Sequence, residues 1–161
     1  MSKIHTIPAT AADPTVAAGT AQFLTPVVLG LQALVVNGKQ AHWNVRGTNF
    51  LPIHELLDSV VTHAQDWSDT AAERIVALGL PIDARLATIS AKVKDTAVPA
   101  GFAQWDEVVS DVISDIDAVL ADIRAAVEGL AEVDASSQDV AIEIQRGIEK
   151  DRWFLVAHLS S

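Results

Sequence analysis

"KQAHWNVRGTNFLPIHELLDSVVTHAQDWSDTAAERIVALG", residues 39–79, ends one segment of helical periodicity and contains the whole of the next. Asn49 can cap a helix, and Pro52 is tolerated in the first turn, where a missing backbone N–H breaks no helical hydrogen bond. Apolar residues then recur at steps of three and four until Gly79, which predicts an amphipathic helix. Its expected buried stripe is Leu56, Leu57, Val60, Ala64, Trp67, Ala71, Ile75 and Leu78.

The sequence before this stretch predicts another amphipathic helix over residues 14–44, ended by Gly47. After it, residues 80–103 form a long connection with one short helical possibility over residues 84–93. The apolar stripe of the first helix is Val16, Ala17, Phe23, Leu24, Val27, Val28, Leu31, Leu34 and Val35.

Two more helices follow the connection. Residues 105–130 have a continuous apolar face, and Ser136 or Ser137 can cap a last helix that runs to about Leu159. Two short-linked helix pairs joined by a long crossover describe an all-α, ferritin-like four-helix bundle. The short extra helix lies in the crossover between helices two and three.

Composition is consistent with one such domain. Half of the 161 residues are hydrophobic, which is enough for a substantial core. We expect residues 14–161 to form the ferritin-like four-helix bundle domain and residues 1–13 to form a flexible tail. No apolar run is long enough to span a membrane without interruption, and residues 1–22 lack the features of an export signal. We therefore expect a cytoplasmic protein with no membrane partner.

The charged and sulfur-containing residues restrict the chemistry further. A formal net charge of −10 argues against a nucleic-acid surface, which depends on clustered Lys and Arg. Cysteine is absent, so thiolate sites are excluded and His and carboxylate remain as metal ligands.

The second predicted helix carries four candidate metal ligands, which are His54, Asp58, Asp69 and Glu73. At about 100° per residue they fall within about 100° of one another, on a flank roughly opposite the apolar stripe. His54 and Asp69 are about 22 Å apart along the helix, at about 1.5 Å per residue. The two i,i+4 pairs therefore cannot share one ion within a chain.

Two copies of this helix, packed antiparallel about a two-fold axis, would bring the pairs together. The midpoint of His54 and Glu73 falls between positions 63 and 64, and so does the midpoint of Asp58 and Asp69. Both pairs would therefore meet about the same two-fold axis. Thr62 and Gln65 are centred there too and point toward the same flank. The predicted interface is isologous, with two equivalent sites per dimer.

His42, at the end of the first helix, can approach the start of the second and join His54 and Asp58. Two imidazoles with carboxylates suit Fe(II) or Zn(II) better than Mg or Ca. Ferritin-like di-iron proteins hold metal inside one bundle with Glu-x-x-His motifs, and this chain has none. The alternative is a solvated helix face that binds no metal.

The pattern His-Trp-Asn, Gly, Phe, His-Glu-x-Leu-Asp and Asp-x-x-Ala-Glu-Arg, within residues 39–79, closely resembles the signature of the Dps family of mini-ferritins. "KDRWFLVAHL", residues 150–159, resembles the closing helix of that family. The resemblance implies a hollow homododecamer built from two-fold dimers. It also implies a ferroxidase that oxidises Fe(II), preferentially with hydrogen peroxide, stores the ferric mineral and protects against oxidative stress.

The resemblance further implies two Fe per intersubunit site, with zinc or other divalent metals able to bind in vitro. Its ligand motif corresponds to His42, His54 and Asp58 of one subunit and Asp69 and Glu73 of its two-fold mate. Trp43 corresponds to the aromatic residue beside the site in the family, where it would supply an electron. Packing at the helix end is the alternative role for Trp43.

Members of the family that compact DNA use a basic tail, whereas residues 1–13 contain one lysine, Lys3. Direct DNA binding is therefore not expected, and a DNA-condensing starvation protein is the alternative function. A metal-dependent hydrolase that uses the same site is a second alternative, because an open His and carboxylate site can activate water. An acidic group could concentrate Fe(II) or could simply be a solvated helix end; its members are Glu128, Glu132, Asp134, Asp139 and Glu143.

Overall fold

The computed structural model describes residues 13–160, and four long helices account for most of them. The long helices are α1 (Pro14–Asn44), α2 (Phe50–Ala77), α4 (Trp105–Leu130) and α5 (Ala135–Leu159). Three short elements join them: β1 (Val45–Arg46), α3 (Leu86–Lys92) and β2 (Ala103–Gln104). The predicted helical bundle with a short extra helix in its crossover is confirmed. Residues 1–12 of the expected tail lie outside the described part of the chain.

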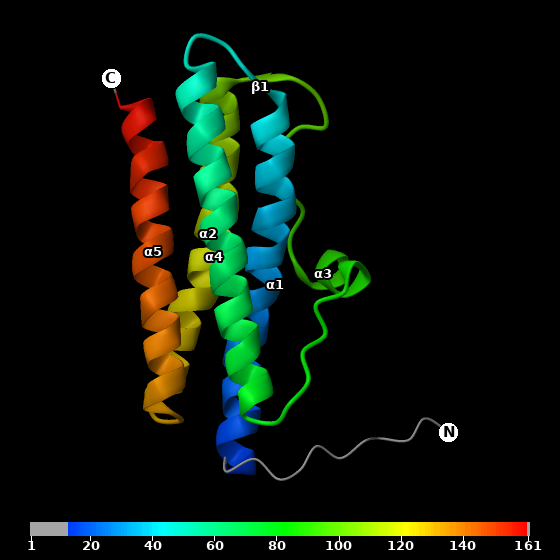
Figure 1. Cartoon of the computed structure of the whole chain (residues 1–161), viewed down its shortest axis with the longest axis vertical. Helices are drawn as coiled ribbons and strands as arrows, with labels where there is room; N and C mark the ends of the chain where they lie inside the picture. Colours follow the sequence, from blue (N-terminus) through cyan, green and yellow to red (C-terminus); the bar gives the residue numbers. More distant parts are fainter. Residues whose placement is uncertain (1–12, 161) are drawn as a thin grey trace.

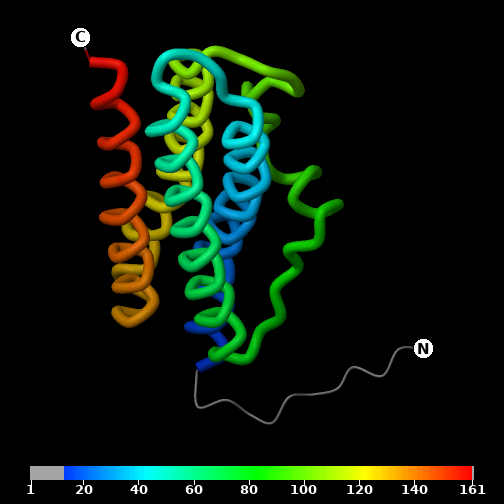
Figure 2. Tube along the Cα trace, turned by 45° about the horizontal axis from the view of Figure 1, so that its top comes forward, coloured from blue at the N-terminus to red at the C-terminus, as the bar shows by residue number. Residues whose placement is uncertain are grey.

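The four long helices form two antiparallel hairpins that pack side by side (Figures 1 and 2). α1 packs against α2 and α4, and α5 packs against α4 and α2. The connection from α2 to α4 runs along the outside of α1, which α3 contacts (Figure 1). One face of α2 is consequently covered by α1 and α5, and its opposite flank is left open.

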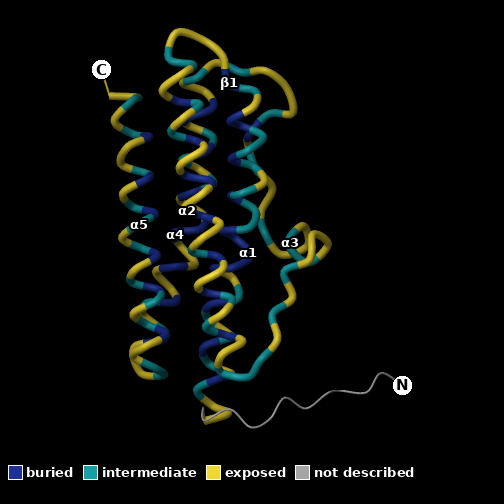
Figure 3. Tube along the Cα trace, viewed as in Figure 1, coloured by how far each residue is buried: buried dark blue, intermediate teal, exposed yellow. Residues whose placement is uncertain are grey.

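The core lies between the inward faces of the helices (Figure 3). The buried residues of α2 are Ile53, Leu57, Val60, Val61, Ala64, Ser68, Ala71 and Ile75. Leu56, Trp67 and Leu78, which the apolar pattern placed in the buried stripe, are only partly buried. Leu56 and Trp67 lie toward one edge of the stripe, and Leu78 is the C-cap residue after the last turn of the helix.

The cap of α5 differs from the prediction. Asp134, rather than Ser136 or Ser137, caps the helix, and its carboxylate accepts the Ser137 N–H at 2.9 Å. Arg74 of α2 favours Asp134 as the capping residue. It donates to the Asp134 carboxylate at 2.7 Å and to the buried Ser137 hydroxyl at 2.9 Å. Asn49 occupies the N-cap position of α2, as predicted, but its side chain makes no capping hydrogen bond.

A two-residue parallel ladder, which the sequence did not predict, ties the first hairpin to the crossover. Val45 pairs with Ala103, and Arg46 pairs with Gln104. Two residues per strand are too few to show the alternation by which strands are recognised. Gly47 follows with φ 113°, in the turn after α1, and a Cβ there would lie 2.7 Å from the Gln104 side chain. Glycine is therefore required by both the backbone and the space.

Among the described helices, α1 alone is long and apolar enough to cross a membrane by length and composition. In the window that meets this criterion, 44% of the residues are buried inside the bundle. The central helix of a bundle satisfies the same criterion, because its apolar residues face other helices on more than one side.

Candidate metal centre

His42 and His54 make reciprocal contacts across the α1–α2 hairpin. His42 Nδ1 lies 2.7 Å from the backbone oxygen of His54, and His54 Nδ1 lies 2.8 Å from the backbone oxygen of His42. The two rings stack with centroids 3.7 Å apart and an interplanar angle of 19°. Phe50 packs against His54 from the first turn of α2, at 5.1 Å between ring centroids. The end of one helix and the start of the next therefore fix each other's histidine.

These contacts determine which ring nitrogens can bind a cation. A carbonyl oxygen only accepts hydrogen bonds, so each Nδ1 must carry a proton and donate it. In a neutral imidazole the lone pair then belongs to Nε2. Metal-binding histidines are commonly held in this way, with the other ring nitrogen donating to a carbonyl or carboxylate. His42 and His54 thus each offer Nε2 as a potential metal ligand.

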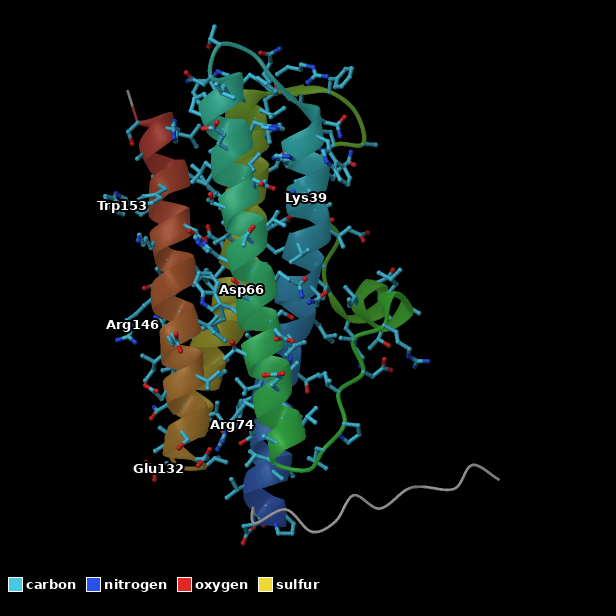
Figure 4. The ribbon with its side chains drawn as sticks, viewed as in Figure 1. Lys39, Asp66, Arg74, Glu132, Arg146 and Trp153 are labelled. Carbon is cyan, nitrogen blue, oxygen red and sulfur yellow. The ribbon has the colours of Figure 1, made fainter. Side chains whose placement is uncertain are left out.

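Asp58 lies one turn after His54 and completes one half of the predicted ligand set. Its carboxylate pairs with the ammonium of Lys39 on α1, the residue labelled in Figure 4, and about half of the Asp58 side chain is exposed. The hydrogen bond from Lys39 lowers the pKa of Asp58, and the nearby His42 and His54 lower it further. The structure therefore brings an ionised carboxylate close to both imidazoles.

Asp69 and Glu73 do not reach this half-site. Both side chains are exposed on α2, and among the described residues neither has a hydrogen-bond or ion-pair partner. As the side chains stand in the single chain, with Asp58 paired to Lys39, no group of three or more His, Cys, Asp or Glu side chains in residues 13–160 is arranged to hold a metal ion. Within one chain, the predicted ligands therefore remain two separate sets on the same open flank of α2.

Two exposed apolar side chains lie on the same flank. Leu51 is 58% exposed and Val76 is 48% exposed, although both belong to long, well-packed helical segments. At about 100° per residue, both point within the arc that holds the candidate ligands. Leu51 and Val76 are also centred between positions 63 and 64, as are the two ligand pairs. This pair was not predicted from the sequence, although an apolar residue on an otherwise polar flank is a signal that could have identified it.

Trp43 extends from the last turn of α1, next to His42 in sequence. It is 63% exposed, and none of the ring contacts found among the described residues involves it. Most of this indole is therefore open to solvent in the single chain.

The acidic residues near the α4–α5 connection do not act as one group. Asp134 is engaged in the α5 cap and in its ion pair with Arg74, and these hydrogen bonds lower its pKa. The other four carboxylates, Glu128, Glu132, Asp139 and Glu143, are exposed. These four carboxylates remain open to solvent, whereas Asp134 does not act as a free acidic group.

Comparisons of the chain with family models, curated proteins and solved structures agree on one family. The model of the ferritin-like domain of ferritins matches residues 30–161. The DNA protection during starvation protein of Agrobacterium fabrum is 34% identical over 122 residues, which is 75% of each chain. A structure of Dps from Microbacterium arborescens in the high iron form is 71% identical, has a TM-score of 0.91 and covers 93% of this chain and 98% of its own. The tetragonal form of Mycobacterium smegmatis Dps has a TM-score of 0.87 at 28% identity and covers 100% of this chain and 96% of its own.

Proposed function

The chain belongs to the Dps family of ferritin-like proteins, and on this premise we propose that it oxidises Fe(II) at sites shared by two subunits and stores the ferric product. The observation that carries the proposal is the reciprocal His42–His54 contact, which leaves both Nε2 atoms available beside Asp58. A merely structural histidine pair would not require an ionised carboxylate one turn away.

The second half of the site comes from another copy of the chain. Antiparallel packing of two α2 helices places Asp69 and Glu73 of the partner subunit against Asp58 and His54. The same register places Leu51 against the partner subunit's Val76, which buries the two apolar side chains that the single chain leaves exposed. Ligand spacing and apolar exposure thus favour one interface, with two equivalent sites per dimer.

Fe(II) is the substrate of this reaction, with two ions per site. Neutral imidazole and carboxylate ligands suit Fe(II) and also admit Zn(II) or other divalent ions in vitro. When two Fe(II) each give one electron to hydrogen peroxide, the O–O bond breaks and two protons complete two molecules of water. The peroxide then receives both electrons together, and no hydroxyl radical is released.

Each side chain has a distinct part in the proposal. His42, His54 and Asp58 bind the first Fe(II), and Asp69 and Glu73 of the partner subunit bind the second together with water. Lys39 neutralises Asp58 until the metal arrives. Exposed Trp43 lies next to His42 in sequence and supplies an electron when only one iron is present.

The proposal extends to the assembly and its surroundings. Two-fold dimers combine into a homododecamer that encloses the mineral, in the cytoplasm and without a membrane partner. Protection against oxidative stress follows from the removal of Fe(II) and peroxide, which needs no contact with DNA. The formal charge of −10 opposes binding to phosphate backbones, so we propose that the cage does not bind DNA directly.

The proposal is tested by adding Fe(II) and then peroxide to the assembled protein and following ferric absorbance and soluble iron. The double variant His54→Ala with Asp58→Ala should lose rapid oxidation, whereas His158→Ala, at a half-buried histidine of α5, should keep it. Equal oxidation by the wild type and the double variant would contradict the proposed site. Hydrolysis of a model amide by the wild type that the same double variant abolishes would instead favour a hydrolase at this site.

A further inference from the structure

His63 and Asp151 form a pair that the intersubunit site does not use. His63 Nδ1, on α2, lies 3.1 Å and 3.0 Å from the two carboxylate oxygens of Asp151 on α5. The Asp151 side chain is only 3% exposed, whereas that of His63 is 48% exposed. One end of the imidazole is therefore fixed to a buried carboxylate, and the other end is accessible.

The buried carboxylate determines the orientation of the ring. An ionised carboxylate only accepts hydrogen bonds, so His63 Nδ1 carries the proton and Nε2 keeps its lone pair. Burial raises the pKa of Asp151, while the hydrogen bond from His63 and the charge of Lys150 act in the opposite direction. A histidine whose Nδ1–H is held by a carboxylate is the arrangement that orients many metal ligands.

The packing of α2 on α5 holds this pair in place. The ring of Trp67 lies 5.4 Å from that of His63 and is tilted by 41°. Trp67 sits over Gly147 of α5, where an added Cβ would lie only 1.9 Å from the indole. The absence of a side chain at Gly147 thus allows the two helices to approach, with His63 against Asp151 one turn further along.

Asp66 places a carboxylate on α2 near His63. The two residues are three positions apart on α2, a spacing that places side chains side by side at about 5–6 Å between Cβ atoms. Asp66 is exposed near the middle of α2 (Figure 4), and its carboxylate has no partner among the described residues. Within residues 13–160, no hydrogen bond or ion pair therefore competes with a cation for this carboxylate.

We propose that His63 Nε2 and the Asp66 carboxylate form a second, intrasubunit site for a divalent transition-metal ion, with Asp151 as the residue that positions the imidazole. Imidazole with a carboxylate selects ions such as Fe(II), Zn(II) or Co(II) over Mg and Ca, and water fills the remaining positions. The site is complete in one chain and does not rest on the proposed intersubunit function.

His63 lies on a different face of α2 from the intersubunit ligands, whereas Asp66 lies at the edge of their flank, about 20° around the helix from Glu73. At about 100° per residue, His63 lies roughly 130° around the helix from the centre of the intersubunit ligand flank. Antiparallel pairing of two α2 helices would therefore leave His63 beside α5 and outside the interface. The metal content of the two sites can be measured separately.

The test uses the full chain with His54→Ala and Asp58→Ala, which disable the intersubunit site, and His5→Gln, which removes the imidazole outside the described residues. Co(II) is added at neutral pH, and bound metal is measured by equilibrium dialysis together with tryptophan fluorescence. We expect about one Co(II) per subunit and quenching of Trp67, because a paramagnetic ion on His63 lies close to the indole. Trp67→Phe should keep the bound metal and lose most of the quenching.

Further variants separate a ligand from a structural residue. His63→Gln should abolish both binding and quenching, and Asp66→Asn, an exposed change that leaves the fold intact, should weaken both. Asp151→Asn should lower the affinity by about 10–100-fold, as loss of an orienting partner does at known metal sites. His158→Gln is the matched control and should change neither signal. Equal Co(II) binding with and without His63, or with and without Asp66, would overturn the proposal.

Discussion

Replacement of Leu51 by glutamate should break the two-fold dimer and so remove the proposed active sites. Leu51 and Val76 are 58% and 48% exposed in the single chain. Complete burial of such side chains contributes about 1.5–3 kcal/mol each, so covering the exposed part contributes roughly 1–1.5 kcal/mol per side chain. A dimer contains two copies of each, which gives roughly 4–6 kcal/mol in total.

Leu51→Glu removes the two leucines from this interface and forces two carboxylates into it. The loss of at least about 2 kcal/mol corresponds to a dimer Kd weaker by at least about 30-fold. Analytical ultracentrifugation of the iron-free protein over a dilution series measures this change. Because Leu51 contacts the partner subunit's Val76 in the proposed register, Val76→Lys in the same chain should restore association through two Glu–Lys pairs. Unchanged association of the single variant, or no recovery in the double variant, would refute this register.

Three other perturbations have predicted outcomes. Asp134→Ala should lower the free energy of unfolding by about 1–2 kcal/mol at pH 7, because it removes the α5 cap and its ion pair. The pKa of Asp134 is lowered in the folded chain, so this contribution is present above about pH 4, near the unfolded pKa, and is lost as the pH falls through the folded value. Denaturant unfolding of wild type and variant measures this contribution. If their difference in free energy of unfolding stays constant down to pH 2, ionisation of Asp134 is not its source. Gly147→Ala should destabilise the chain by about 1–3 kcal/mol through overpacking against Trp67, and by much less in a Trp67→Leu background; equal losses in both backgrounds would exclude that contact as the cause. Lys39→Gln should tighten Zn(II) binding by about a few-fold, because the ammonium no longer competes for Asp58 and an exposed ion pair is weak. Calorimetry that shows weaker Zn(II) binding would contradict this role for the lysine.

The helices could be predicted because each carries its own periodic pattern. The bounds of α1 and α2 follow from Pro14 and from the turn that contains Gly47, both visible in the sequence. The cap of α5 could not be predicted. Asp134, Ser136 and Ser137 are all good caps, and the choice depends on Arg74, which lies about sixty residues away in sequence and reaches the cap only in the folded chain.

For the candidate site, spacing along one helix predicted which side chains share a flank. It could not show the reciprocal bonds between His42 and His54, because these depend on the backbone carbonyls that the hairpin brings together. The ion pair of Asp58 with Lys39 also needs the lateral packing of α1 on α2. The His63–Asp151 pair joins residues 88 positions apart, on two helices whose separation depends on the packing of side chains between them.

The central claim is that each metal site takes ligands from two chains, and mixed assemblies test it most directly. One variant carries His54→Ala and Asp58→Ala, the other carries Asp69→Ala and Glu73→Ala, and each alone should be inactive with Fe(II) and peroxide. When they are dissociated, mixed in equal amounts and reassembled, half of the dimers contain both variants, and each of these has one intact site of two. We predict recovery of about one quarter of the wild-type rate of iron oxidation. Mixed assemblies that are confirmed to contain both variants and yet stay inactive would contradict the shared site.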